Sequence, residues 1–186
     1  MSQVEYVAVG SGDNKILYSK DGVEWKVATG DTFSGGGTGI GVAYSPVQNR
    51  WVAVGLGDNK ILYSNNGVEW VAVTGDTFGG GGTGFGVAYS PVQDLWVAVG
   101  SGDNKILYSE DGAEWVAATG ATFGGGRGVA YNPVQDLWVA VGSGDNKILY
   151  SEDGVEWVAV TGDTFGGDGV GNGVASKSSI FVPSLH

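Results

Sequence analysis

Short runs that alternate large and small apolar residues follow one another along the whole chain, and turn residues separate them. In the unit that starts at Gly41, the apolar runs cover residues 41–45, 51–55, 60–64 and 69–73. A proline turn, a Gly-Asp-Asn turn and an Asn-Asn-Gly turn lie between them. Proline fixes φ in a turn, and glycine accepts the positive φ that a tight hairpin needs. No window shows a 3.6-residue period, so the pattern predicts four short strands per unit and essentially no helix.

This unit occurs four times. The motif Gly-Asp-Asn-Lys-Ile-Leu-Tyr-Ser recurs at steps of 45, 45 and 42 residues, and a tryptophan follows each copy at the same steps. The three missing residues lie between Trp115 and Gly128, in a glycine-rich loop whose length therefore varies. The near identity of the units indicates recent duplication or deliberate construction, and scattered differences such as Leu56 and Ala113 favour duplication.

Repeats of this length with four strands are typical of β-propeller blades. A β-trefoil has three units rather than four, and a β-solenoid has shorter ones. The sequence therefore predicts an all-β chain, a four-bladed β-propeller of four-stranded blades, with residues 1–186 forming a single domain.

The two ends of the chain suggest how such a ring closes. The chain starts with the second strand of a unit, residues 6–10, and finishes with a first strand, residues 173–176. We expect residues 173–181 to pair with the strand near Tyr6, which would complete one blade from both ends and leave no unpaired inner edge. Two alternatives stay open: a half-propeller that pairs with a second chain into an eight-bladed ring, and a domain-swapped homo-oligomer.

A seven-residue motif, Ser-Lys-Asp-Gly-Val-Glu-Trp at residues 19–25, lies on the predicted hairpin between third and fourth strands. It recurs at residues 109–115 and 151–157 with small changes, and Asn65-Asn66 replaces the first acidic pair in the second unit. The motif resembles the Asp-box repeat of sialidase-like propellers, Ser-x-Asp-x-Gly-x-Thr-Trp, with one residue fewer between Asp and Gly and with Glu for Thr. Similar repeats occur in uncharacterised phage, large-virus and microbial propeller proteins.

The resemblance implies a structural role for the motif. Its aspartate would bind the turn amides, and its tryptophan would pack between strands, so we expect all four tryptophans to be largely buried. The residues concerned are Asp21, Trp25, Trp70, Asp111, Trp115, Asp153 and Trp157.

The chain lacks the residues of the obvious enzymes. Sialidase catalysis needs an arginine cluster, and this chain has only Arg50 and Arg127; its one histidine, His186, is terminal and supports no catalytic triad. Repeated carboxylates such as Asp21 and Glu24 could be glycosidase groups. An enzyme usually has one asymmetric site, however, so we interpret them as turn caps and exposed strand residues. The sequence predicts a protein that is not an enzyme and holds no cofactor.

Charge and composition restrict the partners. The net charge of −11 disfavours nucleic acid and anionic membranes, and no stretch approaches the roughly 18 apolar residues that span a bilayer. There is no cysteine for disulfides or thiolate metal sites. The Gly-Asp-Asn-Lys turn offers oxygens to Ca²⁺, but its lysine opposes a cation. We therefore expect an Asx-type turn and no metal site.

Two functions remain: a non-enzymatic repeat scaffold or binding module that presents repeated loops, and a multivalent carbohydrate-binding lectin. Sugar sites commonly combine an aromatic face with acidic side chains, and repeated weak sites gain by avidity. The partner would then be carbohydrate or protein, and the chain a monomer or a domain-swapped homo-oligomer. The phenylalanines among the candidates are more typical of loop anchors. The candidate ligand-binding residues are Asp31, Phe33, Asp76, Phe78, Phe123, Asp163 and Phe165.

Overall fold

The computed structural model describes residues 3–177, and within them the chain is all-β with no helix. The all-β prediction is thus confirmed.

The first sheet holds β1 (Tyr6–Val9), β2 (Ile16–Ser19) and β3 (Trp25–Val27). The second holds β4 (Thr29–Gly30), β5 (Thr38–Ser45), β6 (Arg50–Leu56), β7 (Ile61–Ser64) and β8 (Glu69–Ala72). The third holds β9 (Thr74–Gly75), β10 (Thr83–Ser90), β11 (Leu95–Ser101), β12 (Ile106–Ser109) and β13 (Glu114–Ala117). The fourth holds β14 (Thr119–Gly120), β15 (Gly125–Asn132), β16 (Leu137–Ser143), β17 (Ile148–Ser151) and β18 (Glu156–Ala159).

Each five-stranded sheet combines residues of two repeats. Four antiparallel strands of one repeat form a meander, such as β5-β6-β7-β8, and a two-residue strand from the preceding crossover joins its outer edge in parallel. In the second sheet this pairing sets Thr29 opposite Glu69 and Gly30 opposite Trp70. Each of the first three crossovers therefore binds the blade that follows it.

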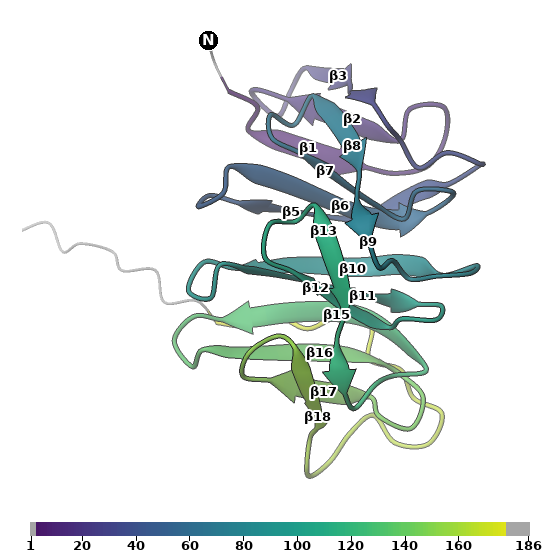
Figure 1. Ribbon diagram of the computed structural model, residues 1–186, viewed down its shortest axis with the longest axis vertical. Helices are drawn as coiled ribbons and strands as arrows, with labels where there is room; N and C mark the ends of the chain where they lie inside the picture. Colours follow the sequence, from purple (N-terminus) through teal and green to yellow (C-terminus); the bar gives the residue numbers. More distant parts are fainter. Residues whose placement is uncertain (1–2, 178–186) are drawn as a thin grey trace, which may run out of the picture.

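The sheets stack face to face along the longest axis of the molecule, in sequence order from β1–β3 to β15–β18 (Figure 1). Their first strands, β5, β10 and β15, lie next to one another. A Cβ atom added at Gly41 would lie 3.6 Å from the Cα of Gly86, and one added at Gly86 would lie 3.4 Å from the Cα of Gly128. This close approach of backbones explains why each first strand carries glycine there.

Apolar side chains fill the space between successive sheets. The alternation of the second strands places Val52 and Val54 in one layer, together with Trp96 and Leu107 of the next sheet. Burial of these side chains provides the main favourable free energy of the fold. Within the described residues, no helix is long and apolar enough to cross a membrane.

One glutamine links the second sheet to the third, and another links the third sheet to the fourth. Gln48, in the turn between β5 and β6, accepts a hydrogen bond of 2.8 Å from the indole of Trp96 and donates one of 2.7 Å to the carboxylate of Asp94. Gln93 makes the same two bonds, 2.7 Å from Trp138 and 2.8 Å to Asp136. We call this arrangement the glutamine relay.

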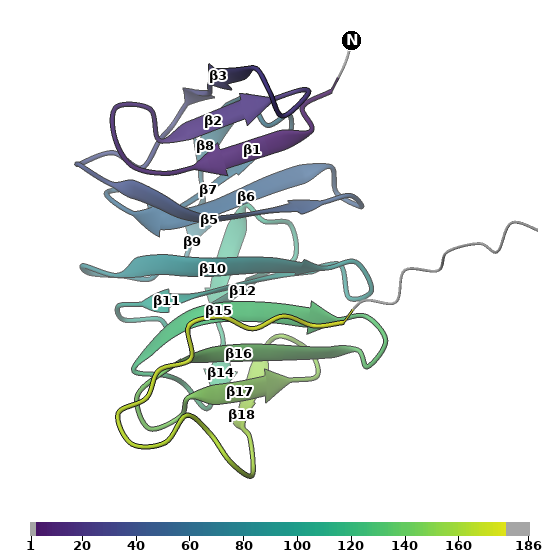
Figure 2. The same cartoon turned by 180° about the vertical axis from the view of Figure 1, so that it is seen from behind.

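The C-terminal segment expected to form a first strand forms no β-strand up to residue 177 and does not meet the N-terminal blade. Ser176 donates a 2.6 Å hydrogen bond to the carbonyl of Tyr131, and the amide of Gly171 donates one of 3.0 Å to the carbonyl of Gly142. Residues 171–176 thus run beside β15, at the opposite end of the stack from β1 (Figure 2). Residues 171–176 lie against β15 in the same way as β15 lies against β10.

The expected pairing of residues 173–181 with the strand near Tyr6 is therefore not formed by the described residues, and residues 178–181 lie outside them. The reason is geometric: each crossover advances the chain by one blade along the stack, away from β1. The structure shows a propeller-type stack of blades, and within residues 3–177 it shows no closed ring.

Candidate functional site

The Asp-box-like hairpin is held by its own polar side chains. Asp111 Oδ1 accepts hydrogen bonds from the amides of Ala113 and Glu114, at 2.8 and 2.9 Å. Ser109 donates to the same carboxylate and accepts from the amide of Gly112. The hairpins at Ser19 and Ser151 repeat these bonds. The serine and aspartate are thereby committed to the turn.

The second repeat shows which property of the side chain the turn requires. There Asn66 replaces aspartate, and its amide oxygen accepts from the amides of Val68 and Glu69, both at 2.9 Å. A neutral oxygen therefore supports the same turn, so the turn requires a hydrogen-bond acceptor but no negative charge.

The environment of these aspartates keeps them ionised. Burial opposes ionisation of Asp111, but hydrogen bonds from the amides of Glu114 and Ala113 outweigh it and lower its pKa from 3.8. Asp153 has a lowered pKa for the same reasons, and at Asp21 the amides of Glu24 and Val23 are the main causes of the lowered pKa. A general acid in a glycosidase needs the opposite, a raised pKa.

The motif tryptophans divide into two groups. Trp70, Trp115 and Trp157 are 1% exposed, whereas Trp25 is 40% exposed. All four donate an indole hydrogen bond to the glycine carbonyl of their hairpin. The expectation of burial is wrong for Trp25, because no crossover strand among residues 3–177 lies against it as Gly30 lies against Trp70.

The candidate phenylalanines lie between blades, with one exception. Phe33 and Phe78 have no exposed surface, and Phe123 is also buried. Phe165 is 50% exposed. The three buried rings are loop anchors in this structure, and they offer no open aromatic face to a sugar. Ligand binding at Phe165 and at the neighbouring exposed Asp163 stays a prediction.

The candidate aspartates of the crossovers bind the next blade. Asp31 Oδ2 accepts a 2.8 Å hydrogen bond from the amide of Ala72, and Asp76 Oδ2 accepts one of 3.0 Å from Ala117. Each bond joins residues 41 positions apart. In the third crossover Ala121 stands at this position and lacks the carboxylate.

The Gly-Asp-Asn-Lys turns are closed by their own side chains. The ammonium groups of Lys15, Lys60, Lys105 and Lys147 each donate to the glycine carbonyl three residues earlier. The side-chain amide of Asn104 donates to the backbone carbonyl of Thr77 in the crossover. Within the part of the chain that the structure describes, no group of three or more His, Asp or Glu side chains is placed to hold a metal ion.

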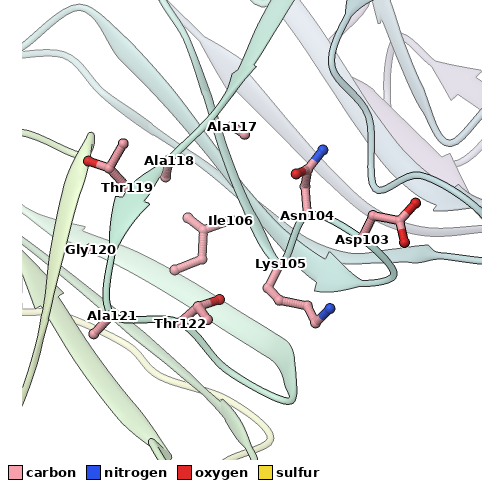
Figure 3. A pocket seen from close by; sticks show the side chains of 10 residues that line it. All are labelled: Asp103, Asn104, Lys105, Ile106, Ala117, Ala118, Thr119, Gly120, Ala121 and Thr122. Carbon is pink, nitrogen blue, oxygen red and sulfur yellow. The ribbon is translucent and has the colours of Figure 1, made fainter.

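A shallow polar depression lies between this turn and the following crossover. In the third repeat its volume is 220 Å³, and Lys105, Asn104 and Thr122 border it (Figure 3). The first repeat has an equivalent of 130 Å³ that includes Asp13, Lys15 and Asp31. Because its lysine and asparagine already bond to the backbone, this depression has few free polar groups.

A second depression lies on the Asp-box-like hairpin, and we call it the tyrosine–acid depression. In the third repeat it has a volume of 270 Å³, and its lining is Tyr108, Ser109, Glu110, Asp111, Glu114 and Val116. It combines an aromatic ring with three carboxylates. The fourth repeat carries the same residue types at Tyr150, Glu152, Asp153, Glu156 and Val158.

In the first two repeats the chain supplies its own cation near the tyrosine, and Arg50 of the second repeat also reaches the hairpin of the third, where its charge helps to lower the pKa of Asp111. The depression of the first repeat has a volume of only 120 Å³, and Lys20 and Lys26 are part of its lining. In the second repeat the guanidinium of Arg50 lies over the ring of Tyr63, 4.9 Å from its centroid, and donates to Asn65 and to the carbonyl of Asp111. Arg50 corresponds to Leu95 and Leu137 in the later repeats.

This site was missed in the sequence. Its signal is the replacement of Lys20 by Glu110 and of Arg50 by Leu95, which changes the charge around an otherwise constant tyrosine. The near identity of the repeats hides such differences, because the shared residues dominate the pattern.

Comparison with known proteins identifies a fold type. No family model and no curated protein matches the chain. Among solved structures, one of a nidogen/laminin complex is similar with a TM-score of 0.63 and 19% identity over 90% of this chain and 64% of the other. A GH74 enzyme of Niastella koreensis gives 0.58, with 22% identity over 84% and 24%. YCF48 bound to D1 peptide gives 0.56, with 18% identity over 85% and 51%.

These neighbours are propeller-type proteins, and at such identities the similarity shows the fold alone. The chain spans less than two thirds of the length of each. The resemblance to the Asp-box family stays a prediction.

Proposed function

We propose that the protein is a non-enzymatic repeat scaffold that binds basic protein segments through the tyrosine–acid depression of its third repeat and through the equivalent residues of its fourth. The observation that carries the proposal is Arg50 over Tyr63. The second repeat thereby has a cation of the chain itself on its tyrosine face, and we propose that a partner supplies the equivalent cation at Tyr108 and Tyr150.

The chemistry of the depression fits a guanidinium or ammonium group. A cation over a tyrosine face is attracted by the ring quadrupole, by about 0.5–1 kcal/mol at an exposed site. Glu110 and Glu114 add carboxylates beside Tyr108, and the net charge of −11 favours encounter with a basic partner. Two copies in one chain would gain by avidity when the partner carries several basic residues.

The same geometry supports a role without catalysis. The hairpin aspartates are bound to backbone amides, their pKa values are lowered, and asparagine replaces one of them. The carbohydrate alternative depended on the crossover phenylalanines, and three of the four are buried.

Fluorescence anisotropy with a labelled hexa-arginine peptide tests the proposal. Tyr108→Leu leaves the protein charge unchanged and should weaken binding about 2–5-fold, the equivalent of one exposed cation–π contact. Tyr63→Leu is the matched control, because Arg50 occupies that ring, and it should change the affinity little.

A second pair of variants distinguishes binding at the tyrosine–acid depression from attraction by the net charge of the protein. Glu114→Gln and Glu69→Gln remove the same charge at the same position of two repeats. The proposal requires a larger loss of affinity for Glu114→Gln. Equal losses for the two variants would show attraction by net charge alone, and selective binding to a glycan array without hexa-arginine binding would favour the lectin.

A further inference from the structure

The contact between neighbouring blades is made three times within the chain. It has two halves, the crossover that inserts and the blade that receives it. Each half recurs once more at one end of the stack. The contact has three parts. The crossover Thr-Gly pairs in parallel with the tryptophan strand, the crossover aspartate accepts an amide of that strand, and the crossover phenylalanine packs against the glycines of the next blade. The third contact lacks the carboxylate, because Ala121 replaces the aspartate. In the first contact these parts are Thr29–Gly30, Asp31 and Phe33.

The first blade presents the receiving half of this contact uncovered. Tyr6 is 51% exposed and its equivalent Trp96 is fully buried; Trp25 and Val27 are exposed as well. A Cβ added at Gly10 would meet no other described residue within 4 Å. At the equivalent Gly55, such a Cβ would lie 3.0 Å from the ring of Phe33.

The last crossover presents the inserting half. Phe165 is half exposed, while its equivalent Phe33 is fully buried. A Cβ at Gly162 would meet nothing within 4 Å among the described residues, whereas one at the equivalent Gly30 would lie 2.3 Å from the carbonyl of Trp70. Gly162 keeps the positive φ of 91° that Gly30 adopts at 86° for this close approach.

We propose that residues 161–176 of one copy dock onto the first blade of a second copy, in the register of the internal contacts. Thr161 and Gly162 would pair with Glu24 and Trp25. The carboxylate of Asp163 would accept the amide of Val27, the ring of Phe165 would cover Gly10, and Ser176 would lie opposite Tyr6.

The occupant is a second copy because the chain's own last crossover lies at the far end of the stack from its own first blade (Figures 1 and 2). The surface continues an interface that the chain already makes three times, so shape and hydrogen bonding are complementary by construction. A head-to-tail contact of this kind forms a ring when its rotation closes and a filament when it does not. The inference is independent of the tyrosine–acid depressions.

Cysteine cross-linking tests the register, since the chain contains no cysteine. Chains with Tyr6→Cys and chains with Ser176→Cys are mixed in equal amounts and oxidised, because cross-strand neighbours lie within disulfide reach. The proposal expects a covalent dimer from the mixture and much less from either variant alone. Equal yields from the single variants would overturn it, as would a double variant that forms its disulfide only within one chain.

Sedimentation velocity of the 186-residue chain gives the second measurement. We expect concentration-dependent association that Phe165→Glu reduces at least tenfold. Val92→Glu is the matched control, because Val92 is an exposed apolar residue in the turn between β10 and β11 and should leave association unchanged. A monomer at all concentrations, or equal effects of the two variants, would contradict the proposal.

Discussion

Trp25 and Trp115 stand in nearly identical sequences and make the same indole hydrogen bond, yet 40% of one and 1% of the other is exposed. The first blade and the third blade thus differ in their neighbours and hardly at all in their own residues. The comparison shows that the hairpin is specified locally, whereas burial of the tryptophan is specified by the preceding crossover.

The largest difference should come from the tryptophans themselves. Trp115→Ala should lower the free energy of unfolding by about 3–5 kcal/mol, as expected for a fully buried large side chain. Trp25→Ala should cost about 1–2 kcal/mol, within the range of ordinary substitutions. Urea denaturation at low protein concentration, where copies do not associate, measures both. Equal losses would mean that the first blade is covered in solution.

The crossover phenylalanines give a second pair. Phe78→Ala should cost about 3–4 kcal/mol because the ring is fully buried between blades. Phe165→Ala should cost less than about 1 kcal/mol, since half of its surface is already in water. Thermal unfolding followed by circular dichroism would detect the difference, and a large effect at Phe165 would contradict it.

Two substitutions at the aspartate position of the crossovers should change the stability in opposite directions. Asp76→Ala removes a hydrogen bond to the amide of Ala117 and should cost about 1 kcal/mol. Ala121→Asp should add the equivalent bond to the amide of Ala159 and stabilise the protein by a similar amount, because the backbone of Ala121 already bonds to Trp157 as that of Asp76 bonds to Trp115. A destabilised Ala121→Asp variant would show that the third crossover holds the side chain differently.

The smallest expected effect is on how the melting temperature depends on pH. The pKa values of Asp111 and Asp153 are lowered in the folded chain, so their contribution to stability is present above the ordinary pKa of 3.8 and is lost as the pH falls through the lowered values. Asparagine keeps the acceptor, as Asn66 shows, but does not titrate. The double variant Asp111→Asn, Asp153→Asn should therefore lose a few degrees less in melting temperature between about pH 5 and pH 2. Parallel curves for the variant and the parent would refute this.

The parts of the fold that depend on one unit were predictable from the sequence. The steps between the Gly-Asp-Asn-Lys motifs and the alternation in each run indicate the strands, and β6, β7 and β8 lie within two residues of the expected positions. The hairpin also follows from local residues, since Ser109, Asp111 and Gly112 are close in sequence.

The parts that depend on neighbouring units were not predictable. Nothing near Asp31 indicates that its carboxylate binds an amide 41 residues later, and nothing near Phe33 distinguishes it from the exposed Phe165. The position of residues 173–176 depends in the same way on how far each crossover advances the chain. Repeats of equal sequence therefore conceal differences that arise from their order in the stack.

The glutamine relay has a consequence for how the protein unfolds. The side chains of Gln48 and Gln93 bond to the blade that follows, as do those of Asp31 and Asp76, so these contacts stabilise the structure between nearest neighbours along one dimension. In such systems opening starts at the ends and spreads inward, and total stability increases with each added unit. Amide hydrogens of β10 and β11 should then exchange most slowly, those of β1 and β3 most rapidly, and an extra 45-residue unit inserted in the middle should raise the melting temperature without disturbing its neighbours.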